Sequence, residues 1–241
     1  MKISIITVTY NAEATIERTM QSVANQSYHD YEHIIMDGAS KDLTVEIAKK
    51  YDAIIVSEPD KGLYDAMNKA MKLATGDFVC FLNAGDKLHS NETLSHIAAA
   101  SSNDVAVIYG DTDIVDDEGR FIRNRRLTPP EHLTWKSFRN GMLVCHQSFY
   151  INRSIMQQYD LAWRFSADFD WCIRCMKAGE QKGMNNIYVR EPLSDYLSEG
   201  MTTANQKASL RERFRIMAKH YGLLPTIAQH IWFILRVFVK K

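Results

Sequence analysis

The first half of the chain alternates apolar runs with segments of helical periodicity. Four apolar runs rich in β-branched residues predict strands at residues 2–9, 31–36, 53–57 and 77–82. Between them, apolar side chains recur at helical spacing over residues 12–26, 42–51 and 63–74. The last of these helices is expected to stop before Gly76, because glycine commonly ends helices. This alternation predicts an α/β fold with a doubly wound, mainly parallel sheet.

The second half of the chain has a different rhythm. Further strands are expected at residues 105–109, 112–115, 120–126, 143–150 and 187–190. Further helices are expected at residues 91–101, 168–178 and 205–221. The turn at residues 116–119 predicts an antiparallel return of the chain. Since no Gly/Ser linker interrupts the sequence, we expect one domain over residues 1–204 and a helical C-terminal appendage over residues 205–241.

Charge divides these two parts of the chain. The 29 basic and 29 acidic residues cancel, which argues against a nucleic-acid-binding protein, and 46% hydrophobic residues argue against disorder. Residues 205–241 nevertheless hold eight Lys and Arg against one Glu, a net charge of +7, so residues 1–204 carry −7. The segment 229–241 is strongly apolar with lysines at its end, as in helices that lie in a membrane interface. The alternatives are packing on the domain or against a dimer partner.

Location can also be inferred from the sequence. No window reaches the roughly 18–20 uninterrupted apolar residues that a spanning helix needs. The N-terminal apolar run is short and lacks a small-residue cleavage site, so it is interpreted as a strand and not as a signal peptide. The four cysteines do not form a disulfide scaffold, and Cys172 and Cys175 fall within an expected helix core. We expect a cytoplasmic protein with reduced thiols, which the basic tail would attach peripherally to the inner membrane.

Carboxylates follow several of the expected strands. Asp37 and Asp86 come after strands, and Asp168 and Asp170 open a helix. Each alone is typical of a turn or helix cap, but together they predict a ligand site at one sheet edge. Asp86 can supply a ligand to a hard divalent cation that bridges phosphates, and Asp37 can accept from a base N–H. Neither a Gly-x-Gly-x-x-Gly nor a P-loop sequence is present.

A set of short motifs in fixed order narrows the function. They are Ser4–Asn11, Gln21–Gln26, Asp37–Asp42, Asp60–Ala70, Thr75–Asp77, Leu82–Asp86, Cys145–Ser148 and Ala167–Arg174. This order resembles family 2 glycosyltransferases, and in particular a bacterial branch that acts on surface polysaccharides. The resemblance covers about residues 2–200.

The resemblance implies a fold and a reaction. The fold would be a single glycosyltransferase-A, Rossmann-like domain with a mixed sheet. The reaction would be transfer from a nucleotide-sugar, with a UDP-sugar favoured, and with inversion at the anomeric carbon. It also implies a divalent metal, Mn²⁺ or Mg²⁺, and a glycan or lipid-linked acceptor. The other classes kept open are a non-catalytic sugar-nucleotide-binding or scaffold protein and a nucleotidyltransferase.

The same resemblance assigns roles to individual residues. Those that would hold the nucleotide are Thr7, Tyr10, Asn11, Asp37, Asp65 and Asn68. Asp86 would bind the metal with Asn83, which stands where the family has a first carboxylate. Asp168 would be the catalytic base, but Ala167 replaces the usual acidic neighbour, so Asp170 stays a second candidate.

Four further features have two interpretations each. His146 and Gln147 would face the donor or acceptor sugar, or His146 is a hydrogen-bonded core residue. Trp171 would stack on a sugar or pack in the core. Asp111-Thr112-Asp113 is a literal Asp-x-Asp, but after a later strand we expect a structural or acceptor-side role instead of metal binding. The loop at residues 197–203 would close over the site or simply join two elements.

Overall fold

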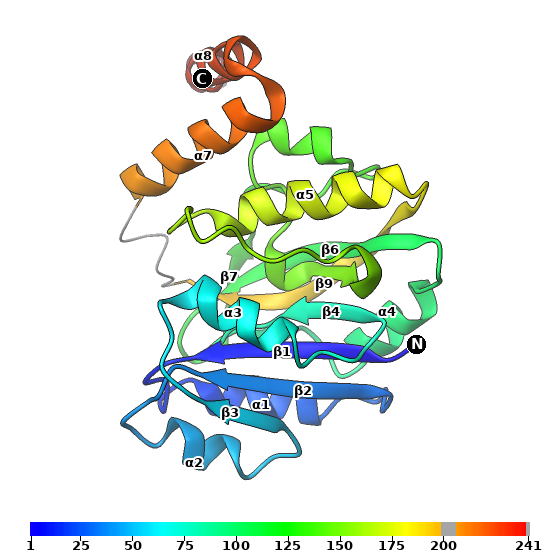
Figure 1. Cartoon of the computed structure of the whole chain (residues 1–241), viewed down its shortest axis with the longest axis vertical. Coiled ribbons are helices and arrows are strands. Elements are labelled where there is room, and N and C mark those ends of the chain that lie inside the picture. Colours follow the sequence, from blue (N-terminus) through cyan, green and yellow to red (C-terminus); the bar gives the residue numbers. More distant parts are fainter. Residues whose placement is uncertain (199–205, 240–241) are drawn as a thin grey trace.

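One curled sheet with helices on both faces forms the body of the protein (Figure 1). The computed structural model describes the backbone of residues 1–198 and 206–239. The strands of these residues form a 9-stranded sheet in the order β3-β2-β1-β4-β8-β6-β9-β5, with β7 paired to β6. The strands are β1 Ile3–Thr9, β2 Tyr31–Asp37, β3 Ile54–Ser57, β4 Phe78–Phe81, β5 Lys87–Leu88, β6 Val105–Val115, β7 Phe121–Asn124, β8 Phe149–Asn152 and β9 Asn185–Leu197.

The strand directions create one edge where a site can form. β1 pairs in parallel with β2 and β4, and β2 with β3, which confirms the parallel arrangement expected for the first half. β8 runs antiparallel to both β4 and β6, and β6 is parallel to β9. The carboxyl ends of β1, β4, β6 and β9 therefore lie at the same edge. The sheet is mixed and mainly parallel, as expected, because the parallel ladders of β1, β2, β3, β4, β6 and β9 are longer than the antiparallel ladders of β5, β7 and β8.

Helices cover both faces because the strands are apolar on both faces. All seven residues of β1 are buried, as in a strand with helices above and below it. The helices and 3₁₀ turns are α1 Ile16–Ala24, α2 Thr44–Ala48, α3 Leu63–Met71, α4 Thr93–Ala100, η1 Trp135–Asn140, η2 His146–Ser148, η3 Arg153–Ile155, α5 Ala167–Gln181, α7 Gln206–Tyr221 and α8 Leu223–Val239. α3, α5 and α7 share the larger apolar cluster, while α1 and α4 share another with the opposite face of the sheet.

The second half departs from the expected strands. The two strands expected over residues 105–115 are one strand, β6, whose pairing with β9 is irregular at Gly110. A Cβ at Gly110 would lie 2.5 Å from the Leu193 side chain, so only glycine allows β9 to pass this closely. The strand expected at 143–150 was wrong, because residues 146–148 form η2 and only Phe149–Asn152 pair as β8. β9 is longer than expected, since pairing with β6 extends it through polar positions.

The C-terminal residues form the two helices α7 and α8. α7 buries Ile216, Met217 and Tyr221 in the main core. α8 is the outermost element, beyond α7 at the end of the molecule (Figure 1). Among the described helices, none combines the length and apolarity needed to cross a membrane. Cys172 and Cys175 are buried on α5 as free thiols, which confirms their expected place in a helix core.

Candidate active site

Four of the expected site residues meet at the carboxyl end of β4. Asp86 lies in the turn after β4, Gln147 and His146 lie in η2, and Asp168 is in the first turn of α5. Gln147 Nε2 donates to Asp86 Oδ2 over 2.7 Å, and His146 Nδ1 lies 3.7 Å from Asp168 Oδ2. The short element η2 thus contacts the expected metal ligand on one side and the expected base on the other.

The Asp86 carboxylate is buried and held by neutral donors. Leu197 N–H donates to Oδ1 over 3.0 Å, opposite the bond from Gln147 to Oδ2. Burial raises the pKa of Asp86 to about 7, and these two hydrogen bonds only partly oppose the rise. The turn itself is fixed by Thr19, whose hydroxyl donates to the Asp86 carbonyl over 2.6 Å and accepts from Gly85 N–H over 2.9 Å. A nearby positive charge would favour the ionised form of this carboxyl.

A second polar chain runs from Asn83 to Asp168. Asn83 Nδ2 and His146 Nε2 are 3.3 Å apart, and burial lowers the pKa of His146, which favours the neutral ring. In that state Asn83 donates to Nε2, and the Nδ1–H of His146 faces Asp168. Tyr64 OH donates to Asp168 Oδ1 over 3.2 Å. Asp168 therefore sits in a fixed orientation in the first turn of α5, where the amide dipoles favour a carboxylate.

The residues around Asp86 fit a hard divalent cation. Asn83 Oδ1 is buried and finds no hydrogen-bond donor among the described residues. It lies in the same turn as Asp86, whose N–H donates to the Asn83 carbonyl over 3.0 Å. Amide and carboxylate oxygens are the ligand types that Mg²⁺ and Mn²⁺ prefer. Both Asp86 oxygens already accept a hydrogen bond, which a cation would have to share or displace, and metal binding by Asn83 and Asp86 stays a prediction.

Asp170 is placed away from this chemistry. Its carboxylate is fully buried and accepts from Arg174 Nε over 2.5 Å and from His220 Nε2 over 2.8 Å, with Lys219 Nζ at 3.4 Å. Burial acts to raise the pKa of Asp170, but the hydrogen bonds from His220 and Arg174 outweigh it and lower the pKa to about 2. A carboxylate paired with Arg174 and Lys219 and hydrogen-bonded to His220 is a poor proton acceptor, so the structure argues against Asp170 as the base.

Trp171 is a core residue and does not reach a sugar. Its side chain is fully buried, its indole N–H donates to the Gln157 carbonyl over 2.5 Å, and its ring stacks on Tyr159 with centroids 5.0 Å apart. Of its two interpretations, core packing is therefore the correct one.

Three of the expected nucleotide ligands point into the protein. Thr7 Oγ1 lies 2.9 Å from the buried His33 Nε2. Asp37 is fully buried and accepts from Ser40 N–H over 2.9 Å and from the Ser57 hydroxyl over 2.6 Å. Asn68 bonds both the N–H and the carbonyl of Tyr159, at 2.7 and 3.0 Å. These side chains shape the site from behind, and their expected direct contact with a nucleotide is not supported.

The other three expected nucleotide ligands are nearer the surface. Tyr10 follows β1 with 61% of its surface exposed, and Asn11 beside it is exposed with a positive φ of 47°. The Asn11 side chain accepts from Lys41 N–H over 2.9 Å. Asp65 accepts from Lys61 N–H over 3.0 Å and keeps 18% of its side chain exposed. Of the three, Tyr10 offers the largest accessible contact surface.

Asp60, which the sequence interpretation did not single out, lies beside Tyr10 and Gly38. Its Oδ1 accepts from Gly62 N–H over 2.7 Å. A Cβ on Gly38 would lie 2.5 Å from Asp60 Oδ2 and 3.4 Å from the Tyr10 ring. The Asp60 carboxylate, the Tyr10 ring and the Gly38 backbone therefore lie side by side, and we call this group the nucleoside corner. The available signal was Asp60 within the segment Asp60–Ala70, but an Asp two residues before a glycine is ordinarily taken for a turn former.

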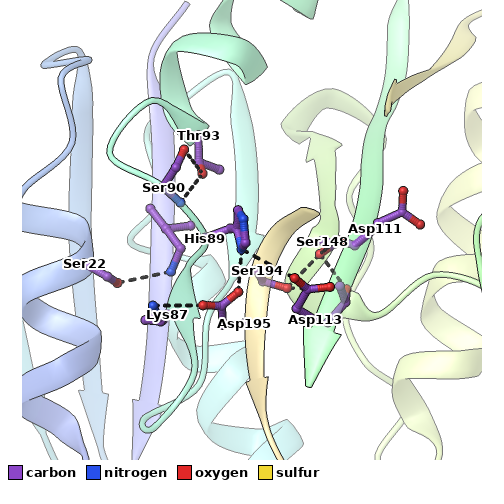
Figure 2. A network of polar contacts seen from close by, with 12 residues as sticks. Ser22, Lys87, His89, Ser90, Thr93, Asp111, Asp113, Ser148, Ser194 and Asp195 are labelled. Carbon is purple, nitrogen blue, oxygen red and sulfur yellow. Dashed lines mark hydrogen bonds and ion pairs between the residues drawn. The ribbon is translucent and has the colours of Figure 1, made fainter. Parts of the chain in front are cut away.

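The Asp-x-Asp motif Asp111-Thr112-Asp113 lies on β6, and its two carboxylates contact different groups. Figure 2 shows Asp113 turned toward His89 and Asp195, and Asp111 turned away from them. His89 Nδ1 lies 2.6 Å from Asp195 Oδ1 and 4.0 Å from Asp113 Oδ2, and Asp195 also pairs with Lys87 over 2.9 Å.

The ligand atoms of His89, Asp113 and Asp195 lie within 4.8 Å of one another, so this group is a second place where a metal could bind. Lys87 and the hydrogen bond from His89 already occupy both oxygens of Asp195. The arrangement ties β5 to β9 and β6, in agreement with the structural role expected for Asp113.

A cavity of about 290 Å³ lies beside the residue that precedes His146. Its wall includes Asp111, Thr112, Asn124, Arg125, Leu143 and Cys145. Arg125 fixes part of this wall, because its guanidinium donates to the carbonyls of Met142, Leu143 and Leu127 over 2.6, 3.1 and 2.9 Å. Asp111 accepts from Tyr188 OH over 2.6 Å. The expected closing loop at 197–203 lies mostly outside the described residues.

Comparison with known proteins gives the fold and the family. The structure of S. aureus TarS 1–349 in complex with UDP-GlcNAc superposes with a TM-score of 0.73 and 18% identity, covering 97% of this chain and 73% of that one. Glucosyl-3-phosphoglycerate synthase from Mycobacterium tuberculosis, in complex with Mn²⁺, UDP and phosphoglyceric acid, gives a TM-score of 0.62 at 17% identity, covering 90% and 78%. The chain thus has the glycosyltransferase-A fold.

Relatives by sequence agree with the fold. A PGL/p-HBAD biosynthesis glycosyltransferase of Mycobacterium bovis (strain BCG / Pasteur 1173P2) is 34% identical over 183 residues, 71% of this chain and 68% of the relative. The Escherichia coli UDP-Glc:alpha-D-GlcNAc-diphosphoundecaprenol beta-1,3-glucosyltransferase WfgD is 23% identical over 223 residues, 89% and 85% of the two chains. The family model "Glycosyl transferase family 2" matches residues 4–160. Motif order, fold and these matches agree, and the chain is a glycosyltransferase that belongs to family 2.

Proposed function

We propose that this enzyme is an inverting, metal-dependent transferase that moves a sugar from a UDP-sugar to a hydroxyl group of a glycan or lipid-linked acceptor. The observation that carries the proposal is the contact of η2 with both Asp86 and Asp168. An acidic metal ligand and a separate carboxylate base, one on each side of a bound donor, are what a single displacement requires.

On the donor side, Asp86 and Asn83 would hold the divalent cation together with the diphosphate. Asp86 supplies the carboxylate, and Asn83 Oδ1 is the buried oxygen that has no other donor among the described residues. When bound, the cation would offset the negative charge that grows on the departing UDP. Mn²⁺ and UDP together occupy the structurally similar synthase of M. tuberculosis, which supports this assignment.

On the acceptor side, Asp168 would take the proton of the attacking hydroxyl. The hydroxyl oxygen forms a bond to the anomeric carbon, the bond from that carbon to the diphosphate breaks, and UDP leaves with the electron pair. The Tyr64 hydroxyl, which donates to Asp168 Oδ1, would hold the carboxylate in position, and the His146 ring lies beside it. General-base assistance of this kind contributes about 10²- to 10⁴-fold.

The nucleoside would bind at the corner formed by Tyr10, Gly38 and Asp60. The exposed Tyr10 ring can stack on a base, and Asp60 Oδ2 beside it can accept a hydrogen bond from a base N–H. Uracil offers one such N–H, so this corner suits UDP. This assignment transfers to Asp60 the role that the sequence had suggested for the buried Asp37.

The acceptor would enter from the side of the cavity near Cys145. The Asp111 carboxylate in its wall can accept hydrogen bonds from sugar hydroxyls. The relative WfgD is named for an acceptor on diphosphoundecaprenol, which supports a lipid-linked acceptor here as well. With such an acceptor the enzyme would work in the cytoplasm at the surface of the inner membrane.

Turnover with a panel of donors tests this proposal directly. Release of UDP from one UDP-sugar, dependent on Mn²⁺ or Mg²⁺ and abolished by chelation, is the expected result. The anomeric configuration of the product, read by NMR, should be opposite to that of the donor. Donor binding without turnover under all conditions would favour a non-catalytic sugar-nucleotide-binding protein instead.

A further inference from the structure

Helix α8 carries a row of large apolar side chains that face solvent. The exposed fractions run from 39% for Ile227 to 78% for Leu224. The row consists of Leu223, Leu224, Ile227, Ile231, Trp232, Ile234 and Leu235. Leu224, Ile227, Ile231 and Ile234 recur at steps of three and four residues, which places them on one face of the helix. Exposed apolar residues are normal singly, whereas a continuous row marks an interaction surface.

The opposite face of α8 is anchored to the protein. Thr226 is buried, and Gln229 Nε2 donates to Asn140 Oδ1 of η1 over 3.2 Å. The His230 ring packs edge-on against Phe214 of α7 with centroids 5.0 Å apart. α8 is thus an amphipathic helix with a fixed orientation, and it is the outermost element in Figure 1.

Helix α7, which packs against α8, carries exposed positive charge. Lys207, Arg211 and Arg215 recur every four residues on α7, and all three are exposed. The one acidic residue of segment 205–241 is Glu212, and its carboxylate accepts from the backbone N–H groups of Arg164, Phe165 and Ser166 over 2.9, 2.8 and 3.0 Å. α8 contains no acidic residue. The basic face is therefore compensated poorly by its own segment.

The apolar row on α8 and the basic residues on α7 together favour one binding partner over another. A second copy of the chain would bring the same positive charges together, which opposes association. An anionic bilayer offers both complements, hydrocarbon for the row and negative headgroups for the basic residues. We propose that α7 and α8 form a docking surface for an anionic membrane, with α8 lying in the plane of the interface. Membrane docking would give the enzyme access to a lipid-linked acceptor, and this benefit rests on the proposed function.

Vesicle flotation of the full-length protein tests the docking surface. We expect the wild type to float with vesicles of phosphatidylcholine and phosphatidylglycerol, and at least tenfold less with phosphatidylcholine alone, since each basic residue near an anionic surface contributes about fivefold. The variant Leu224→Ser/Ile231→Ser/Leu235→Ser should lose flotation. Arg211→Gln/Arg215→Gln should lose about tenfold or more on the anionic vesicles.

Matched controls carry the same substitutions elsewhere on the surface. Leu43 and Ile54 are exposed at 60% and 45%, and Lys49 and Lys50 are exposed near α2. Leu43→Ser/Ile54→Ser and Lys49→Gln/Lys50→Gln should float like the wild type. If the wild type fails to float on anionic vesicles, or the controls fall as far as the α7 and α8 variants, the docking surface is refuted.

Two measurements separate the alternatives. Light scattering without vesicles that shows a dimer, dispersed by Leu224→Ser/Ile231→Ser/Leu235→Ser, combined with no flotation, would assign the row to a second copy and overturn the proposal. Binding of UDP with Mn²⁺, and release of UDP in solution without vesicles, should be unchanged in that variant. Flotation without any turnover would refute the proposed function and leave the docking surface standing.

Discussion

The assignment of the base between Asp168 and Asp170 leads to a prediction with two independent readouts. Replacement of either carboxylate by its amide removes a charge and keeps the shape. Asp170 is buried among Arg174, His220 and Lys219, so Asp170→Asn should weaken the fold. Asp168 keeps 17% of its side chain exposed, and Asp168→Asn should leave the fold nearly unchanged.

The pKa of Asp170 gives the size of the effect. A fall from 3.8 to about 2 corresponds to about 2–3 kcal/mol of native-state stabilisation by the charged form. Removal of one partner from a fully buried ion pair costs about 3–5 kcal/mol. Here Arg174 and Lys219 keep 20% and 46% of their side chains exposed, so we expect the lower end of that range. We expect Asp170→Asn to lower the free energy of unfolding by about 3 kcal/mol at pH 7.

The sign of the pH dependence follows from the lowered pKa. The native state holds Asp170 ionised more strongly than the unfolded chain does, so this contribution is present above the unfolded pKa of about 4. It is lost as the pH falls toward the native pKa of about 2. The difference in stability between wild type and Asp170→Asn should therefore shrink in acid.

The assay pairs chemical denaturation with turnover. Urea unfolding at neutral and acidic pH gives the stability of each variant, and UDP release under conditions where each is fully folded gives kcat. Asp168→Asn should lose about 10²- to 10⁴-fold in kcat with normal stability, while Asp170→Asn keeps kcat within a few fold. A folded Asp170→Asn that binds donor normally but has lost kcat, beside an active Asp168→Asn, would refute the reasoning.

Three shorter predictions concern the metal, the nucleoside and the strand network. Asp86→Ala should lower metal-dependent kcat/KM about 100-fold, whereas Asp111→Ala keeps its response to Mn²⁺ titration; the reverse result would move the metal to β6. Asp60→Asn should weaken UDP binding roughly tenfold by calorimetry with unchanged thermal unfolding, and equal affinity would remove Asp60 from the nucleoside corner. The hydrogen bond to Asp195 raises the pKa of His89, so the protonated ring stabilises the fold below about pH 6.5, and this contribution is lost as the pH rises through the raised pKa. His89→Gln should flatten that part of the Tm profile, and a variant with the wild-type profile would contradict it.

The parallel half of the fold was predictable because its signals are local. Each strand there is a largely apolar run flanked by a turn, and burial on both faces leaves β1 with only apolar and small hydroxyl side chains. The expected strand at 143–150 had the same composition, yet residues 146–148 turn inward so that Gln147 can bond Asp86. The hydrogen bond from Gln147 to Asp86 joins residues far apart in the sequence, so the local apolar pattern could not predict the 3₁₀ turn.

The sequence indicated candidate site residues but not the residues that support them. Asp86, Asp168 and His146 were named from their positions after strands and in ordered motifs, and their roles stay predictions. Asp170 differs from Asp168 through its partners Arg174, Lys219 and His220. Lys219 and His220 lie on α7 and meet Asp170 only in the folded chain. Asp37 turned inward for the same kind of reason, since its partner Ser57 comes from the neighbouring strand.

The short element η2 has a consequence for how this enzyme can diversify. His146 and Gln147 are adjacent in the chain, and their side chains contact Asp168 and Asp86 respectively. If Asp168 is the base and Asp86 the metal ligand, as proposed, neighbouring residues of one 3₁₀ turn set the distance between the two carboxylates. Surface loops and the cavity wall could then change to suit a new sugar or acceptor while that distance stays the same.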